Sequence, residues 1–127
     1  MATLLVLVIS PFLLQNQTAQ AKSKSEQKIA TAPNISIDTS LYFPAKLPAP
    51  AIMLAHGFGG SKDSVASQAT FFQTKGFVVL TWSARGFGNS SGEIEMNSPT
   101  AEVADSRALI DFLASRPEVI QQAKADP

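Results

Sequence analysis

Residues 51–63 read AIMLAHGFGGSKD, an apolar run that stops at His56 and is followed by three glycines within four residues. A short, wholly apolar run bounded by glycine predicts a strand buried on both faces, as in parallel sheets. Glycine lets the chain turn sharply there and lets another group approach the backbone closely. Open α/β sheets bind ligands beyond the carboxyl ends of their strands, so the turn His56-Gly57-Phe58-Gly59 is the first candidate site.

Composition narrows the possible functions. The chain has 127 residues, 45% hydrophobic and 16% charged, with a formal net charge of zero. This balance gives no electrostatic reason to expect nucleic acid or an anionic membrane as a partner. The chain has no cysteine, which excludes disulfides and thiol catalysis, and its one histidine leaves little scope for a metal site. We therefore expect neither a metal nor another cofactor.

The first 21 residues carry no charge and contain an apolar run over residues 4–14. That run is too short for a bilayer span, which needs about 20 residues. Ala19-Gln20-Ala21 has the small-x-small form of a signal-peptidase site, so residues 1–21 are interpreted as a signal peptide and the protein is expected to be exported. No Lys or Arg precedes the run. The alternative is a buried strand or helix of the fold, which Pro11 would interrupt.

Residues 22–33 are polar and charged and are interpreted as a linker, so the folded domain is expected over residues 34–127. Residues 35–38 and 41–43 are short β-prone runs typical of an edge hairpin. Three prolines, at positions 44, 48 and 50, then make a stiff connection to the central strand at residues 51–55.

A helix should follow the glycine turn, with Ser64 as N-cap and Gly76 just past its end. The apolar residues 77–82 come next as a second buried strand, which completes a βαβ unit. Ser98-Pro99 predicts the start of another helix, whose apolar side holds Val103, Leu109, Ile110 and Leu113. These elements leave a sheet edge unpaired, so we interpret the chain as an incomplete α/β fold, the front part of something larger.

Gly88-Asn89-Ser90-Ser91-Gly92 matches the pattern Gly-x-Ser-x-Gly. A nucleophile elbow of this pattern needs a strand running straight into it and a helix straight after it. The preceding strand ends at Trp82, and no helix follows at once. Ser90 is therefore interpreted as a loop residue, with the nucleophile as the less favoured alternative.

His56 is the one imidazole available as a general base. Its tight position before Gly57 favours a structural role instead, in which it shapes the turn together with Gly57 and Gly60. Arg85-Gly86 is open to two interpretations, an anion site or a loop tied down by the arginine, and we favour the second. The charged residues Asp105, Arg107, Asp111 and Arg116 are interpreted as the solvated face of the last helix.

With these residues in view, the chain over residues 35–119 resembles the N-terminal part of an α/β-hydrolase. More narrowly it is similar to the Xaa-Pro dipeptidyl-peptidase-like group, which includes cocaine-esterase-like acyl esterases. The matching pieces are LYFPA at 41–45, HGFGGSKD at 56–63, ARGFGNSSG at 84–92, LIDFL at 109–113 and Arg116-Pro117. Ser83 departs from the pattern, because many relatives carry Asp there.

The resemblance implies a serine nucleophile, an Asp and a final His, in that order, beginning on a strand just beyond Pro127. No member of that triad is then expected in this chain. The turn itself would supply a backbone N–H, at Phe58 or Gly59, to an oxyanion hole.

Two hypotheses follow. In the first, the chain is a fragment of a serine hydrolase that cleaves a peptide bond of Xaa-Pro type or an ester, and it is inactive alone. In the second, it is a small exported, non-catalytic binding module with a βαβ core. The partner expected of the complete protein is a peptide or ester substrate, with no nucleic acid and no stable membrane span, and the sequence predicts no oligomeric state.

Overall fold

The computed structural model describes residues 22–121. The segment interpreted as a signal peptide, residues 1–21, lies outside the described residues. The elements are β1 (Ser23–Ala32), β2 (Ile35–Phe43), β3 (Ala51–Ala55), the 3-10 helix η1 (Lys62–Val65), α1 (Ala66–Thr74), β4 (Val78–Trp82) and α2 (Glu102–Ala114). No helix among residues 22–121 has the length and apolar character that crossing a bilayer requires.

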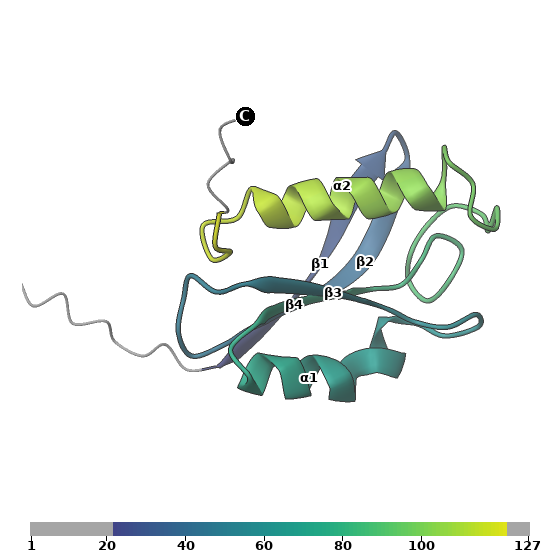
Figure 1. Ribbon diagram of the computed structural model, residues 1–127. Coiled ribbons are helices and arrows are strands. Elements are labelled where there is room, and N and C mark those ends of the chain that lie inside the picture. The colour runs from purple at the N-terminus through teal and green to yellow at the C-terminus, as the bar shows by residue number, and fades with distance from the viewer. Residues whose placement is uncertain (1–21, 122–127) are drawn as a thin grey trace, which may run out of the picture.

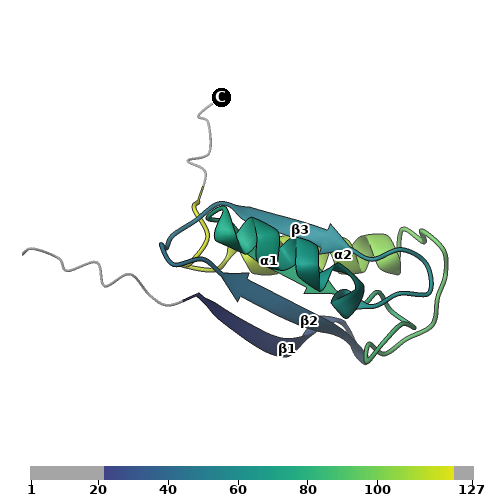
Figure 2. The ribbon, with the colours of Figure 1, turned by 90° about the horizontal axis from the view of Figure 1, so that it is seen from below.

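One four-stranded sheet, in the order β1-β2-β4-β3, lies between two helices. Helix α2 covers one face and α1 the other (Figure 1). Strands β3 and β4 are parallel, from Ala51 opposite Val78 to Ala55 opposite Trp82, and α1 connects them. The predicted βαβ unit is therefore confirmed. The sheet continues through antiparallel pairs from β4 to β2 and from β2 to β1 (Figure 2).

The core has two layers because successive strand residues point to opposite faces of the sheet. On β4, Val78 and Leu80 face α2, while Val79 faces α1. The α2 layer is the larger, and its buried apolar residues are Ile37, Leu41, Ala49, Val78, Leu80, Leu109, Leu113 and Val119. The α1 layer is built on Tyr42, Ala69 and Val79, with Phe72 and Phe77 packed beside them.

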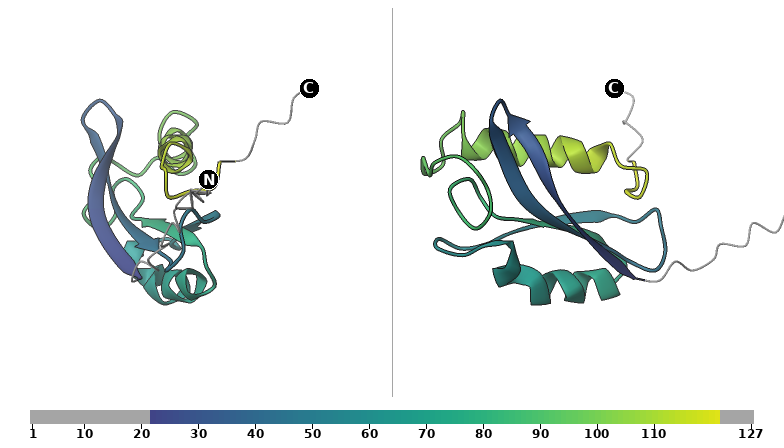
Figure 3. Two further views of the ribbon diagram at one scale, coloured as in Figure 1. Left: turned by 90° about the vertical axis from the view of Figure 1, so that its left-hand side faces the viewer. Right: turned by 180° about the vertical axis from the view of Figure 1, so that it is seen from behind.

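The predicted linker is wrong, because residues 23–32 form β1 rather than a tether. Lys28 lies opposite Asp38 in the antiparallel pair with β2. The strand arises from backbone pairing, and its charged, mostly exposed side chains are typical of an edge strand that must not pair with another chain. Figure 3 shows the long β1–β2 ribbon rising beside α2.

The predicted hairpin within residues 35–43 is also wrong, because both runs belong to the single strand β2. The polar residues Asp38, Thr39 and Ser40 in the middle of this strand are buried, and each finds a partner. Thr39 donates its hydroxyl to the carbonyl of Gln27, and Asp38 accepts from Lys62. Polar residues at these positions are therefore buried groups with hydrogen-bond partners, and they do not indicate a turn.

Strand β3 has the predicted bounds but not the predicted burial. It lies at the edge of the sheet, and its residues are half-buried or exposed. Among residues 22–121, its ladder partner is β4 alone. The sheet is thus the incomplete α/β arrangement that the sequence predicted.

Both predicted helix starts are displaced. Ser61, not Ser64, is the N-cap, and it heads η1, where Ser64 completes a capping box by accepting from the Ser61 N–H. Helix α2 begins at Glu102, after a turn in which the Ser98 carbonyl accepts from the N–H of Ala101. Gly76 follows α1 with φ +94°, as predicted for a C′ glycine.

Candidate functional site

The glycine turn leaves the carboxyl end of β3 and closes on itself. The Gly60 N–H donates to the Gly57 carbonyl at 3.0 Å, and Gly59 has φ +79°. A Cβ on Gly60 would lie 2.9 Å from Ser64 Oγ. Position 59 therefore needs glycine for its backbone angle, and position 60 for close packing.

Backbone donors of this turn have no acceptor among residues 22–121. Among residues 22–121, the N–H groups of Phe58 and Gly59 donate to no other protein group. The Phe58 side chain is 81% exposed and packs edge-on against Phe87, with ring centres 5.4 Å apart. A fixed turn with unpaired N–H groups is the arrangement that stabilises a developing oxyanion.

His56 uses both ring nitrogens on backbone groups. Its Nδ1 lies 2.7 Å from the Gly57 carbonyl, and its Nε2 accepts from the Ala84 N–H at 3.0 Å. In this network Nδ1 carries the proton, and the lone pair of Nε2 accepts the hydrogen bond from Ala84. The ring thus fastens the glycine turn to the loop after β4, and its nitrogens are not directed at a nucleophile.

Ser90 lies in that loop with its hydroxyl fully engaged. Its Oγ donates to the Ser83 carbonyl at 2.6 Å and accepts from the Asp38 N–H at 2.8 Å. No helix starts after it, since α2 begins at Glu102. The residue therefore lacks the strand-to-helix bend of a nucleophile elbow.

A buried ion pair that sequence reasoning did not single out fixes the end of the glycine turn to β2. Lys62 is 5% exposed, and its Nζ lies 2.9 Å from Asp38 Oδ1. The Lys62 N–H also donates to Ser83 Oγ at 3.1 Å. Asp38 and Ser83 together thus hold the glycine turn and the Ser90 loop to β2. Lys24, by hydrogen bond, and Lys62, by charge, lower the pKa of Glu26 beside this pair.

A second buried ion pair anchors the loop after β4 to α2. Arg85 donates from Nε to Asp105 Oδ2 at 2.7 Å and from Nη2 to Oδ1 at 2.8 Å. The hydrogen bond to Asp105 raises the pKa of the guanidinium. Asp105 is only 3% exposed, so the prediction that it lies on a solvated helix face is wrong. Gly86 beside it has φ +78°, and a Cβ there would lie 2.7 Å from Ile94 Cγ1.

A small cavity of about 190 Å³ lies at the carboxyl ends of β3 and β4. Its lining includes His56, Trp82, Arg85, Glu102 and Asp105. The charged groups that line this cavity already have partners. Arg85 and Asp105 pair with each other, and Glu102 accepts from the N–H of Glu95 at 2.7 Å. Among residues 22–121, no group of three or more His, Cys, Asp or Glu residues is arranged to hold a metal ion.

This sheet, with helices on both faces and a glycine turn after β3, defines an α/β-hydrolase that is represented by its N-terminal part. The sequence model of the X-Pro dipeptidyl-peptidase (S15) family matches residues 34–123. The chain therefore belongs to that family.

Individual relatives agree with this assignment. The chain is 35% identical over 89 residues to the uncharacterized protein YcjY of Escherichia coli K12. This match covers 65% of this chain and 29% of YcjY. It is 29% identical over 109 residues to the thiohydrolase aneE of Aspergillus aculeatus, covering 85% of this chain and 32% of aneE. The crystal structure of the α/β-hydrolase GrgF from Penicillium sp. sh18 superposes with a TM-score of 0.67 at 26% identity, over 77% of this chain and 34% of GrgF.

The chain spans about a third of the length of the curated relatives that it matches.

Proposed function

We propose that this chain is the N-terminal part of a serine hydrolase that cleaves a peptide bond of Xaa-Pro type or an ester bond. In the complete enzyme the acyl group passes through a serine, while the N–H of Phe58 or Gly59 stabilises the oxyanion. The observation that carries the proposal is the pair of unpaired N–H groups at the end of β3, in a chain of the X-Pro dipeptidyl-peptidase family.

We further propose that residues 1–127 are inactive alone. Ser90, the one serine in a nucleophile-like pattern, and His56, the one histidine, both spend their polar side-chain atoms on backbone groups. An acyl-transfer site needs a serine or its equivalent within hydrogen-bond reach of a base. The nucleophile, the acid and the base must then come from polypeptide that this chain does not hold.

The type of bond that the complete enzyme cleaves must be determined by assay. The family is named for X-Pro dipeptidyl peptidases, whereas the Aspergillus relative is a thiohydrolase. Peptide, ester and thioester cleavage share a tetrahedral oxyanion, which the same backbone donor can stabilise. The substrate panel should therefore contain all three bond types.

The test compares two proteins. One is the full 127-residue chain. The other is the same chain joined at its C-terminus to the part of YcjY that follows the matched 89 residues, hereafter the fusion. Both are given aminoacyl-proline anilides, p-nitrophenyl esters, a thioester and a fluorophosphonate probe for reactive serines. We expect labelling and turnover in the fusion and none in the chain alone. Turnover by the chain alone that survives Ser90→Ala would refute its proposed inactivity, and turnover lost on that change would restore Ser90 as the nucleophile.

Export is proposed separately, on the apolar run and the Ala19-Gln20-Ala21 site. Cleavage after Ala21 would remove no residue of β1, which starts at Ser23. Fractionation of a bacterial host, with N-terminal sequencing, tests this proposal. A mature chain that begins at Lys22 outside the cytoplasm is expected, and a cytoplasmic chain that retains Met1 or Ala2 contradicts it.

A further inference from the structure

The glycine turn is attached at both of its ends to consecutive residues of the loop after β4. At the start of the turn, the His56 ring accepts from the Ala84 N–H at 3.0 Å. At its end, the Lys62 N–H donates to Ser83 Oγ at 3.1 Å. Residues 57–61, which hold the candidate oxyanion donors, lie between these two attachments. The position of the donors therefore depends on how firmly the turn and the loop are fixed to each other.

Asp38 of β2 binds both the loop and the turn. Its main-chain carbonyl accepts from the Ser83 N–H at 2.9 Å, and its N–H donates to Ser90 Oγ at 2.8 Å. Its carboxylate accepts from Lys62 Nζ at 2.9 Å. The backbone of this one residue thus fixes the loop, while its side chain fixes the end of the turn. A substitution that changes only the side chain separates the two attachments.

The ion pair between Lys62 and Asp38 is buried, with side chains that are 6% and 10% exposed. A second carboxylate oxygen, Glu26 Oε2, lies 3.5 Å from Lys62 Nζ, but the Glu26 side chain is 55% exposed. Asp38 is therefore the main partner. An ion pair on the surface contributes little and would restrain the turn weakly. A buried pair keeps its geometry, because either charge is costly inside the protein without the other.

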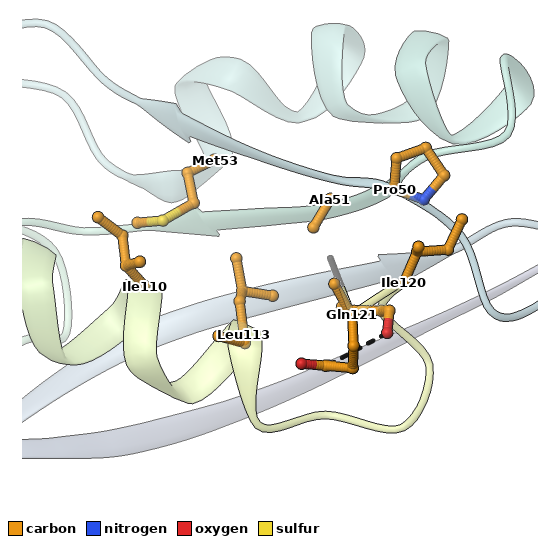
Figure 4. Close-up of a pocket in the computed structure, with 9 residues that line it drawn as sticks. Pro50, Ala51, Met53, Ile110, Leu113, Ile120 and Gln121 are labelled. Atoms are coloured by element: carbon orange, nitrogen blue, oxygen red, sulfur yellow. Dashed lines mark hydrogen bonds between the residues drawn. The ribbon is translucent and has the colours of Figure 1, made fainter. Parts of the chain in front are cut away.

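The α2 side of the sheet provides no such direct link to the turn. The apolar groove between β3 and α2 has a volume of about 590 Å³, with Ile110 and Leu113 projecting from its walls (Figure 4). Among the described residues that line it, none is charged. The buried pair of Arg85 and Asp105 makes no hydrogen bond to the glycine turn within the described part of the chain. The ion pair that acts on the turn itself is the one between η1 and β2.

We propose that Lys62 and Asp38 are positioning residues of the oxyanion site. Their buried ion pair holds the end of the glycine turn, so that the N–H groups of Phe58 and Gly59 keep a fixed direction toward the reacting carbonyl. The inference rests on the proposed function for the reaction that these donors assist. Both side chains act through the turn and not on the substrate, so they affect the rate of the chemical step more than substrate binding. A displacement of about 1 Å at such a site can lower the rate by roughly a hundredfold.

The first experiment separates the stability of the fusion from the position of the turn. Lys62→Met leaves the Asp38 carboxylate buried without its main partner and is expected to destabilise the fusion. The double variant Asp38→Leu with Lys62→Met replaces both charges by apolar side chains of similar size, so its stability is expected to return to near that of the parent. The hydrogen-bonded attachment of the turn is lost in both variants.

Catalysis is measured on the substrate that the parent fusion turns over, together with the rate of fluorophosphonate labelling at saturating probe. In the double variant, both kcat and the labelling rate are expected to fall by roughly ten- to a hundredfold, with KM within about twofold of the parent. A double variant that is as stable as the parent and reacts at the parent rate overturns the inference. So does a variant in which KM rises while kcat is unchanged, because the pair then affects substrate binding.

Gln73→Leu is the matched control for loss of stability away from the turn. Gln73 is 7% exposed, and its Nε2 donates to the carbonyls of Ser23 and Phe43, beside the start of β4. The substitution leaves these carbonyls without their side-chain donor and is expected to lower stability. The kcat of the folded control is expected to stay within about twofold of the parent. A fall in kcat as large as that of the double variant would mean that lost stability alone slows the reaction, and would overturn the inference.

The position of the turn is also measured without catalysis, by amide NMR of the 127-residue chain. The signals of Phe58 and Gly59 are expected to shift or broaden in the double variant and to stay in place in Gln73→Leu. Unchanged signals in the double variant would overturn the inference. A parent fusion that the fluorophosphonate probe does not label would count against the proposed hydrolase function, whereas shifted Phe58 and Gly59 signals would still support the positioning of the turn by the ion pair.

Discussion

Arg85 and Asp105 form a two-point ion pair that joins the loop after β4 to helix α2, with both side chains almost completely removed from solvent. Thr31 of β1 also donates its hydroxyl to the same carboxylate. One buried carboxylate thus connects the edge strand, the helix and the loop that the His56 ring contacts. This junction, rather than Arg85 alone, keeps the loop in place beside the glycine turn.

Replacing Asp105 by Ala should destabilise the chain strongly, because Arg85 would stay buried without its partner. Loss of one member of a buried ion pair costs about 3–5 kcal/mol. Urea unfolding of the 127-residue chain measures the change. Asp111→Ala is the matched control on the exposed side of α2 and should leave the unfolding midpoint in place. Similar midpoints for the two variants would mean that the pair does not support the fold.

Stability should decrease in acid in part through Glu102. The Glu95 N–H, the largest contribution, and the Ser98 N–H donate to this carboxylate and lower its pKa from 4.5. A carboxyl whose folded-state pKa is depressed adds stability above its unfolded pKa and loses it as the pH falls through the folded value. Glu102→Gln should therefore reduce stability at pH 6–7, and its difference from the parent should shrink below about pH 4.5. A difference that does not change with pH, followed by chemical denaturation, would contradict this assignment.

Ser90→Ala should affect stability and not catalysis. The change removes an acceptor from the Asp38 N–H and a donor from the Ser83 carbonyl, both at part-buried positions. An unsatisfied buried group of this kind costs about 1–3 kcal/mol. Ser115→Ala, at an exposed hydroxyl bonded to the Phe112 carbonyl, is the control and should have a smaller effect. In the fusion, fluorophosphonate labelling should persist after Ser90→Ala, and its loss in a folded variant would point to Ser90 as the reactive serine.

The role of the glycine turn can be tested at two glycines that have equal room for a side chain but different backbone angles. Neither Gly57 nor Gly59 has an atom within 4 Å of an added Cβ, but only Gly59 has a positive φ, at +79°. Gly59→Ala should cost about 1–2 kcal/mol of stability, whereas Gly57→Ala should be close to neutral. In the fusion, Gly59→Ala should also slow labelling by the probe, because the free N–H groups are displaced. Equal labelling rates for both variants would argue against an oxyanion role for this turn.

Much of the fold could be predicted from local patterns. The bounds of β3, the βαβ unit and Gly76 at the end of α1 all depend on residues close in sequence, where hydrophobic runs and glycine act directly. Strand β1 could not be predicted in this way, since its residues are polar and its stability comes from pairing with β2. The burial of Asp38 and Asp105 could not be predicted either, because each carboxylate is paired with a cation 20 or more positions away in the chain, Lys62 or Arg85.

The sequence by itself determined that a glycine turn ends an apolar strand, and that this turn and the Arg85 loop carry the family pattern. Tertiary structure alone decided which polar groups are free and which are bound. It ties up Ser90 and His56 with backbone partners, leaves the Phe58 and Gly59 N–H groups open, and places β3 at an unpaired edge. The physical reason is that strand type and turn shape follow from neighbouring residues. Whether a donor is satisfied depends on which distant segments the fold brings within hydrogen-bond distance.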